Sequence, residues 1–316
     1  TTLMRAWRRP ETVGVHEPGW NALARNADIV LPCTTSFERN DLGVARGEAH
    51  LFAMRRVVEP VGEALNDHDI LAAIAGRLGF ADAFTDGRDE MGWVRHLYAL
   101  SRQRAAAHDL DLPDFETFWE AGEIRLPPPA VEHSLLEAFR ADPEANRLAT
   151  PSGRIEIASD RIAGFGYPDC PGHAVWLEPA EWLGGLAAGR FPLHLVSNQP
   201  ATRLHSQYDN GAFSLASKVA GREPVTLNPV DAAARGIADG DLVRLFNDRG
   251  ACLAGAILSD AVAPGVVQLA TGAWYDPADP TADDTLDRHG NPNVLTLDGG
   301  GRVAQAESKA RQARRT

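Results

Sequence analysis

The stretch LHLVSNQPATRLHSQ, residues 193–207, changes from a mostly apolar strand into a polar loop at a proline. Residues 197–207 contain two serines, a threonine, two glutamines, an asparagine, an arginine and a histidine. Neutral amides and hydroxyls complement the edges of heterocycles, and an arginine offers a fixed fork of donors to an anionic group. The stretch therefore favours a loop that holds a polar, anionic ligand, although an ordinary polar loop after a strand has the same composition.

The segments around this stretch predict a domain built mainly from short strands. Asn228 is expected to cap a short helix with Pro229 at its first position and Gly236 at its end. Turn sequences occur at 239–240, 247–250 and 264–265. The expected strands are 224–227, 242–246, 251–258 and 266–269. Short strands at this spacing are typical of a closed barrel.

The beginning of the chain predicts a different architecture, a parallel α/β sheet. Residues 12–16 and 28–32 have strand composition, and residues 20–26, between them, have helical composition. Ligands of such sheets bind beyond the carboxyl ends of the strands, which here are residues 16–17 and 33–41. A helix is expected over residues 69–78.

The helix at 69–78 has recognisable ends. Asn66 or Asp67 is its expected N-cap, and Gly79 ends it. Further helices are expected at 91–107 and at 114–120, the second ending at Gly122. Residues 127–151 are interpreted as a connector, followed by a strand at 155–157.

Composition excludes several classes of protein. The formal net charge of −12 argues against nucleic-acid binding by the chain as a whole. The cysteines Cys33, Cys170 and Cys252 lack the spacing of zinc ribbons or iron–sulfur ligands. The sequence contains no run of eighteen apolar residues, so it predicts no membrane-spanning helix. The sequence also lacks a Gly-x-Ser-x-Gly elbow, which argues against a serine hydrolase, and a phosphate-loop motif.

Several collinear motifs give the chain a specific resemblance. Residues 222–241 with 246–250 resemble the C-terminal domain of the dimethyl sulfoxide reductase family of molybdopterin enzymes, and residues 27–32 with 38–41 resemble that family's preceding α/β domain. The same subgroup, which holds biotin sulfoxide, trimethylamine-N-oxide and dimethyl sulfoxide reductases, is indicated by residues 4–7, 205–207, 272–277 and 291–296. Biotin sulfoxide reductases resemble the chain most.

The resemblance implies the fold class α/β plus all-β. Residues 1–110 would form the C-terminal part of an α/β molybdopterin oxidoreductase domain, and residues 111–188 a helical and irregular connector. Residues 189–316 would form a six-stranded double-psi β-barrel that binds a molybdopterin dinucleotide. The chain begins in what resembles the middle of a helix, so we expect it to start inside a larger protein.

The resemblance also implies a cofactor, molybdenum bound by two molybdopterin guanine dinucleotides. The implied activity is reduction of S- or N-oxides by oxygen-atom transfer. Residues of the opening loop would contact the pterin, with Arg203 on a pyrophosphate or a pterin carbonyl: Ser197, Asn198, Gln199, Thr202, Arg203, His205 and Ser206.

Five further residues match cofactor-binding positions of the family one at a time. Arg39 would lie beside a dinucleotide, and Asp67 would accept hydrogen bonds from guanine. Trp274 and Asn293 would line the cofactor, as would Gln305, whose flanking residues depart from the family pattern. The respective alternatives for the first four are a surface ion pair, a helix cap, core packing and a turn amide.

The family's metal ligand would precede every residue present here, so no residue is assigned a catalytic or metal-binding role. Molybdenum or tungsten, the electron donor and the particular oxide remain open. The implied partners are a small S- or N-oxide and no nucleic acid, and the expected location is the cytoplasm, with the periplasm as the alternative. A second reading is a truncated, non-catalytic molybdopterin-binding module.

Overall fold

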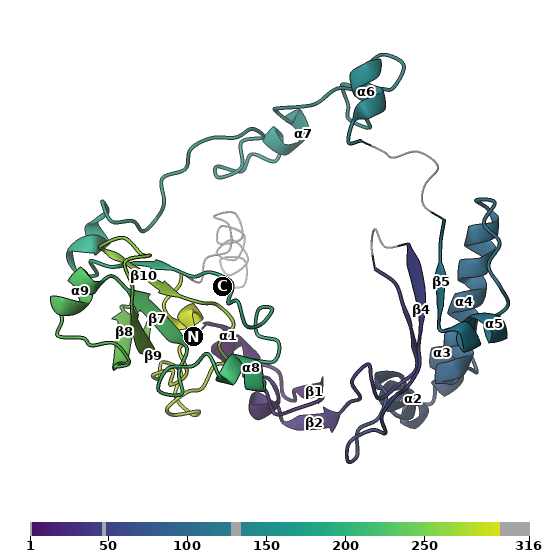
Figure 1. Ribbon diagram of the computed structural model, residues 1–316, viewed down its shortest axis with the longest axis horizontal. Coiled ribbons are helices and arrows are strands. Elements are labelled where there is room, and N and C mark those ends of the chain that lie inside the picture. The colour runs from purple at the N-terminus through teal and green to yellow at the C-terminus, as the bar shows by residue number, and fades with distance from the viewer. Residues whose placement is uncertain (1, 46–48, 128–133, 298–316) are drawn as a thin grey trace, which may run out of the picture. The chain divides into compact units, whose positions relative to one another are not determined.

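The computed structural model describes residues 2–45, 49–127 and 134–297, and the chain divides into two compact units. We call Pro10–Ser134 the α/β unit, and Thr1–Arg9 together with Leu135–Thr316 the β unit. Figure 1 shows the elements of both, and each unit is described by itself. The units divide the chain at other positions than the three predicted domains, which stay a prediction.

The α/β unit, residues 10–134, contains five short strands and five helices among its described residues. Its strands are β1 (Gly14–Glu17), β2 (Ile29–Pro32), β3 (Asp41–Gly43), β4 (His50–Met54) and β5 (Glu123–Arg125). Its helices are η1 (Ala24–Asn26), α2 (Asp67–Arg77), α3 (Ala81–Thr85), α4 (Glu90–Ala106) and α5 (Phe115–Ala121). Four of these are α-helices and η1 is a single 3₁₀ turn.

The predicted parallel pair at the start of this unit is confirmed. β1 and β2 pair in parallel, with Val15 opposite Val30 and Glu17 opposite Pro32. Just after β2, Cys33 forms an isolated parallel bridge with a third segment, at Leu65 before α2. The helix predicted at 20–26 is shorter than expected, since only η1 is helical.

A second, antiparallel sheet in the order β3-β4-β5 was not predicted. It packs on α4 and α5 through a core of Leu51, Val94, Tyr98, Phe115 and Phe118. The rings of Tyr98 and Phe118 stack with centroids 4.4 Å apart. The helices themselves match the predicted ranges, and Gly122 ends α5 in the left-handed conformation with φ of 87°.

The β unit contains a five-stranded sheet and several short helices. Its strands are β6 (His194–Val196), β7 (Pro224–Leu227), β8 (Leu242–Asn247), β9 (Gly250–Leu258) and β10 (Val266–Leu269). Its helices are α1 (Thr2–Trp7), α6 (Glu137–Ala141), α7 (Asp160–Ala163), η2 (Leu186–Gly189), α8 (Ala212–Leu215), α9 (Pro229–Ala233) and η3 (Pro292–Val294). The predicted strands and the cap of α9 by Asn228 are confirmed.

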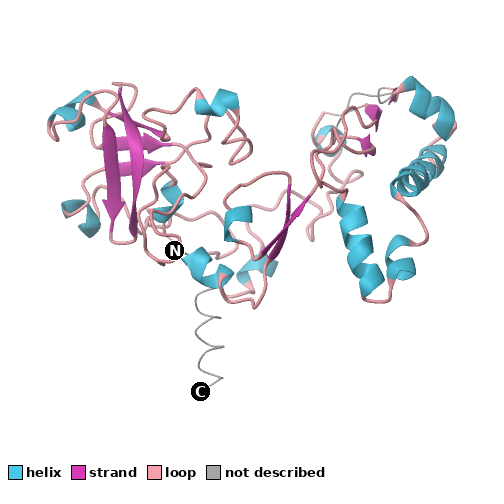
Figure 2. Cartoon of the chain, turned by 90° about the horizontal axis from the view of Figure 1, so that it is seen from below, coloured by secondary structure: helices cyan, strands magenta, loops and turns pink. Residues whose placement is uncertain are grey.

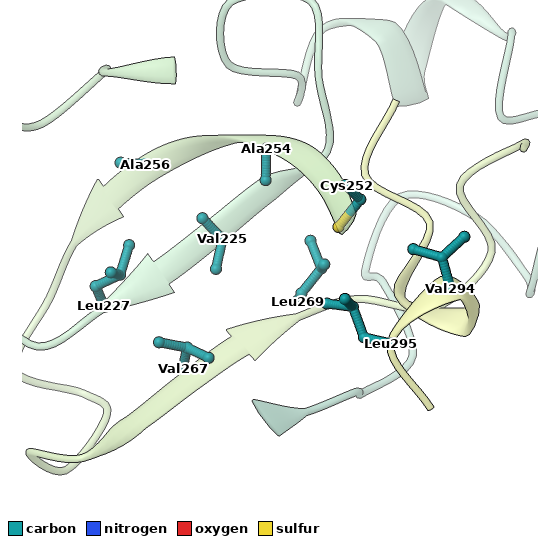
Figure 3. Packing of buried hydrophobic residues seen from close by; sticks show 9 residues of the cluster. All are labelled: Val225, Leu227, Cys252, Ala254, Ala256, Val267, Leu269, Val294 and Leu295. Atoms are coloured by element: carbon teal, nitrogen blue, oxygen red, sulfur yellow. The ribbon is translucent and has the colours of Figure 1, made fainter. Parts of the chain in front are cut away.

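The sheet is mixed and curled, with the strand order β6-β10-β7-β9-β8. β6 pairs in parallel with β10 and β7 in parallel with β9, whereas the other two pairings are antiparallel. Figure 2 shows the strands side by side, and Figure 3 shows side chains of β7, β9 and β10 meeting on one side. This core includes Val225, Cys252 and Leu269, each fully buried. Within residues 134–297 the sheet has five strands, with β6 and β8 at its edges.

The segment between α6 and β6 is mostly loop, and here the prediction of a strand at 155–157 is wrong. Ile155 and Ile157 are 62% and 89% exposed, so no core rewards strand pairing. The described pairings nearby are isolated bridges, between Ala158 and His173 and between Tyr167 and Cys170.

Candidate functional site

The polar loop 197–207 begins at the end of β6 and packs against the segment that follows β10. Thr271 N donates to the Asn198 carbonyl oxygen at 2.9 Å, and the Trp274 indole N–H donates to the Ser206 carbonyl oxygen at 2.7 Å. Between these bonds lies Gly272, with φ of 90°, where a Cβ atom would stand 1.9 Å from the His205 carbonyl oxygen. The loop and this segment therefore form one joint surface that requires glycine at 272.

The side chains of the loop that were predicted to bind a cofactor differ in burial. Gln199 Nε2 lies 3.0 Å from His205 Nδ1, across the loop, and His205 has a positive φ of 50°. The Asn198 Oδ1 atom is buried and has no hydrogen-bond partner among the described residues. Thr202 is half-buried, and the exposed residues are Ser197, Gln199, His205 and Ser206. The loop thus combines one orphaned acceptor with several accessible donors.

Arg203 differs from the rest of the loop, because its side chain is only 1% exposed. Its Nη2 donates to the Thr271 carbonyl oxygen at 3.0 Å and lies 3.2 Å from Glu223 Oε1. Its Nε lies 3.4 Å from Asp209 Oδ1. The structure therefore places this guanidinium inside the unit, below the loop, where it joins the loop to neighbouring segments.

Arg203 belongs to a buried ion network of two cations and two anions. Lys218 Nζ lies 2.6 Å from Asp209 Oδ1 and 2.5 Å from Glu223 Oε2. The side chains of Arg203, Lys218, Asp209 and Glu223 are each no more than 2% exposed. Charges removed from water destabilise a fold unless each has a partner. Equal numbers of opposite charges at these distances meet that condition.

Asp209 is the member of the network with the most partners. Its Oδ2 accepts the Trp274 backbone N–H at 2.9 Å and lies 2.9 Å from His289 Nε2. Burial alone raises the pKa of Asp209, but the hydrogen bonds from His289, Lys218 and the Trp274 backbone outweigh it and hold the pKa well below its ordinary value. Asp209 is therefore ionised whenever the unit is folded near neutral pH.

The turn that precedes η3 is organised by another buried carboxylate, Asp287. It accepts backbone N–H groups from Asp276, His289, Gly290 and Asn291, at distances between 2.7 and 3.2 Å. Burial nevertheless raises the pKa of Asp287, because desolvation disfavours its charge more than these bonds favour it. The same burial and the nearby carboxylate raise the pKa of the Cys252 thiol to about 12.

The remaining predicted residues of the β unit lie apart from one another. Trp274 is half-buried against the loop through its bond to Ser206. Asn293 is exposed on η3, and it lines a cavity of about 720 Å³ with Arg5 and Arg244. Among the described residues, that lining contains none of residues 197–207. Gln305 lies outside the described residues.

In the α/β unit, predicted residues gather at the carboxyl ends of β1 and β2. His16 Nδ1, from the end of β1, lies 2.9 Å from Asp67 Oδ1. Asn66 caps α2 by accepting the His68 N–H, so the interpretation of Asp67 as the cap is wrong. The Asp67 side chain is 48% exposed, which leaves its second oxygen accessible to a ligand.

Arg39 lies in the turn that follows β2. Its Nη1 donates to the Thr34 carbonyl oxygen at 2.9 Å, and its Nε lies 3.7 Å from Asp41. Two buried polar atoms next to these residues, Thr34 Oγ1 and His68 Nε2, have no hydrogen-bond partner among the described residues. Natural proteins rarely leave buried polar atoms unpaired without a functional reason. The cluster has the donors and acceptors that a nucleotide requires.

Sequence reasoning missed Lys218, Asp209, Glu223 and His289. One signal was present: Lys218 is one of only two lysines in a chain with 31 lysines and arginines, and it lies in a stretch of small and apolar residues, 211–220. The described residues contain no group of three or more His, Cys, Asp or Glu side chains able to hold a metal ion. They also contain no helix long and apolar enough to cross a membrane.

Two family models match the chain in the regions that carry these two clusters. Residues 193–311 match the molydopterin dinucleotide binding domain, and residues 1–77 match the molybdopterin oxidoreductase domain. The chain is therefore similar to molybdopterin enzymes in two separate regions. Loop 197–207 and the segment 271–276 lie within the first matched region, and the His16–Asp67 cluster lies within the second.

Curated relatives are similar to this chain along almost its whole length. A biotin sulfoxide reductase from Cereibacter sphaeroides is 52% identical over 94% of the chain, and a dimethyl sulfoxide/trimethylamine N-oxide reductase from the same organism is 49% identical over 94%. A trimethylamine-N-oxide reductase from Salmonella typhi is 46% identical over 97%. The chain spans 39%, 36% and 37% of these relatives, respectively.

A solved structure is similar to this chain in fold. Acetylene hydratase from Pelobacter acetylenicus matches with a TM-score of 0.70 over 94% of the chain and 38% of its own chain. The sequence identity of that match is 18%, so it bears on the fold alone.

Proposed function

We propose that this chain supplies part of the binding surface for a molybdenum bis(molybdopterin guanine dinucleotide) cofactor in an enzyme that reduces S- or N-oxides. The bound cofactor would supply the oxygen-atom transfer, whereas the protein binds and orients it. The observation that carries the proposal is the buried, unpartnered Asn198 Oδ1 in a loop whose other hydroxyl and amide groups are accessible. A pterin edge presents donors and acceptors that such groups complement.

Most residues of the loop would contact the cofactor directly. Asn198, Gln199 and Thr202 would bind the pterin, and His205 and Ser206 would extend this surface toward Trp274. Because Arg203 is buried and engaged by Asp209, Glu223 and Thr271, we propose that it positions the loop from below instead of contacting a pyrophosphate. Ser197, Asn293 and Gln305 complete the proposed set.

The cluster in the α/β unit would bind a guanosine moiety. Asp67 has an accessible carboxylate oxygen that can accept the N–H groups of a guanine edge. Arg39 would lie beside the phosphates, because its guanidinium is only partly used by Thr34 and Asp41. The unpartnered Thr34 Oγ1 and His68 Nε2 support a polar ligand in this cluster.

The finer assignments rest on the same resemblance. We propose that residues 189–316 form a double-psi β-barrel whose described part is the curled five-stranded sheet. Residues 1–110 and 111–188 would be the end of the α/β domain and the connector. The cytoplasm is the proposed location, with a small S- or N-oxide as substrate. The alternative is a molybdopterin-binding module without activity of its own.

Metal and nucleotide analysis tests the proposal. The natural protein would be purified under native conditions, its molybdenum and tungsten measured by mass spectrometry, and GMP measured after acid hydrolysis. We expect one metal and two GMP per protein, and oxidation of reduced methyl viologen by biotin sulfoxide, trimethylamine N-oxide or dimethyl sulfoxide. Metal and GMP without turnover of any oxide would favour the non-catalytic module, and absence of both would contradict the proposed cofactor.

A further inference from the structure

One buried carboxylate, Asp209, connects three segments that are far apart in the sequence. Its Oδ1 contacts Arg203 of the polar loop and Lys218. Its Oδ2 accepts the backbone N–H of Trp274 and contacts His289, two residues before the turn residue Asn291. The three segments are the polar loop 197–207, the segment 271–276 with Trp274, and the turn 287–291 before η3. The side chains of Arg203 and Trp274 also join the loop to the segment 271–276, and Asp209 adds the connection to His289.

Three groups lie close to the carboxylate, Lys218 Nζ at 2.6 Å and the Trp274 N–H and His289 Nε2 at 2.9 Å each. Ser214 Oγ and Arg203 Nε lie 3.4 Å away. The Trp274 N–H belongs to the backbone, so its 2.9 Å bond to Oδ2 fixes the chain next to Gly272, where the loop and the segment are in closest approach. The side chain of His289 is 21% exposed, whereas that of Asp209 is 1% exposed. A change at Asp209 therefore acts on the surface from within the unit.

We propose that Asp209 is the positioning residue of the cofactor surface, holding loop 197–207, the segment 271–276 and the turn 287–291 in register. The inference rests on the proposed function, because the three segments form a cofactor surface only if the cofactor binds there. Lys218 and Glu223 have a different task. They neutralise the charges of Asp209 and Arg203, and thereby allow the carboxylate to be buried.

A pair of variants separates the positioning role of Asp209 from the charge balance of the network. Asp209→Asn leaves two cations against one carboxylate, so it changes both the charge balance and the positioning. Asp209→Asn with Lys218→Met restores the balance, leaving Arg203 paired with Glu223. Replacing both members of a buried ion pair is often neutral for stability. The double variant therefore tests positioning in a folded protein, and Asp260→Asn, an exposed turn residue, is the control.

The experiment measures cofactor content, melting temperature and amide exchange in the full natural protein and its variants. In Asp209→Asn we expect molybdenum and GMP to fall about tenfold or more, because a charge-assisted hydrogen bond is lost. The Trp274 amide should exchange faster. In the double variant the melting temperature should recover while cofactor content stays low. Recovery of both together, or normal content in Asp209→Asn, would overturn the proposal.

Amide exchange also separates this inference from the proposed function. If the natural protein holds neither metal nor GMP, the proposed function fails, but exchange at Trp274 still reports whether Asp209 fixes the segment. Unchanged exchange at 271–276 in Asp209→Asn would then contradict the positioning role on its own. Faster exchange would support that role for a surface whose ligand differs from the proposed cofactor.

Discussion

The two units hold their candidate binding residues by opposite physical means. In the β unit, four charged side chains with at most 2% exposure lie beneath the polar loop. In the α/β unit, the paired His16 and Asp67 side chains are 24% and 48% exposed. A buried network is stable only when complete, whereas an exposed pair contributes little and tolerates rearrangement. We infer that the loop has its conformation before a ligand binds, whereas the His16 and Asp67 side chains can change theirs on binding.

The largest expected effect comes from breaking the buried network at its lysine. Lys218→Met leaves Asp209 and Glu223 close together without the cation that lies between them. We expect the free energy of unfolding to fall by about 3–5 kcal/mol, as measured by urea denaturation. The control is Arg235→Met, which removes an i,i+4 pair with Asp231 and should cost about 0.5 kcal/mol. Equal losses in the two variants would show that the network does not stabilise the unit.

The next effect comes from the contact between loop and segment. Gly272→Ala places a Cβ against the His205 carbonyl oxygen and also requires a positive φ, so we expect a loss of about 2–5 kcal/mol and a displaced loop. Gly236→Ala has a similar φ of 65° but open space around it, and should cost only about 1–2 kcal/mol. Thermal unfolding of both variants measures the difference. Identical losses would mean that the close approach does not hold the loop.

Acid titration sharpens the comparison between the two buried carboxylates. The pKa of Asp209 lies below its ordinary value of 3.8, so its stabilisation is complete above that value and declines as the pH falls below it. The stability difference between the wild-type protein and Asp209→Asn should therefore shrink by up to about 1.4 kcal/mol per pH unit. Asp287, whose pKa is raised, should show the opposite trend when compared with Asp287→Asn. Parallel pH profiles for both variants would contradict these assignments.

The smallest expected effect is at the start of α2 in the α/β unit. Asn66→Ala removes the cap that precedes Asp67 and should cost about 1 kcal/mol, visible as a lower melting temperature. Asn66→Ser keeps a capping oxygen but loses the amide that donates to Glu90, and should retain most of that stability. A loss of several kcal/mol from Asn66→Ala would mean that this cluster is as rigid as the β unit.

The sequence predicted the elements whose causes are local. The cap and proline of α9, the glycine that ends α5 and the apolar runs of β1 and β2 depend on neighbouring residues, and all are confirmed. The loop after β6 was also identified from its own composition. The parallel pairing followed from the order strand, short helix and strand.

The rest depends on contacts between distant residues. The network joins Arg203 to His289 through Asp209, and no local pattern connects positions so far apart. The burial of Arg203 has the same cause, since it depends on Glu223 and Asp209. Ile155 and Ile157 were expected in a strand because they are apolar, but they have no core to pack against. β3 and β5 are three residues each, too short for a periodic pattern.

The central claim is that loop 197–207 and the segment 271–276 form the cofactor surface. The most direct measurement is amide hydrogen exchange of the natural protein with its cofactor and after the cofactor is removed. We expect the cofactor to slow amide exchange in 197–207 and 271–276, and also around Arg39 and Asp67. β8 and β9 should exchange at the same rate in both states. Unchanged exchange in the loop, with protection appearing only around the cavity of Arg5, Arg244 and Asn293, would contradict it.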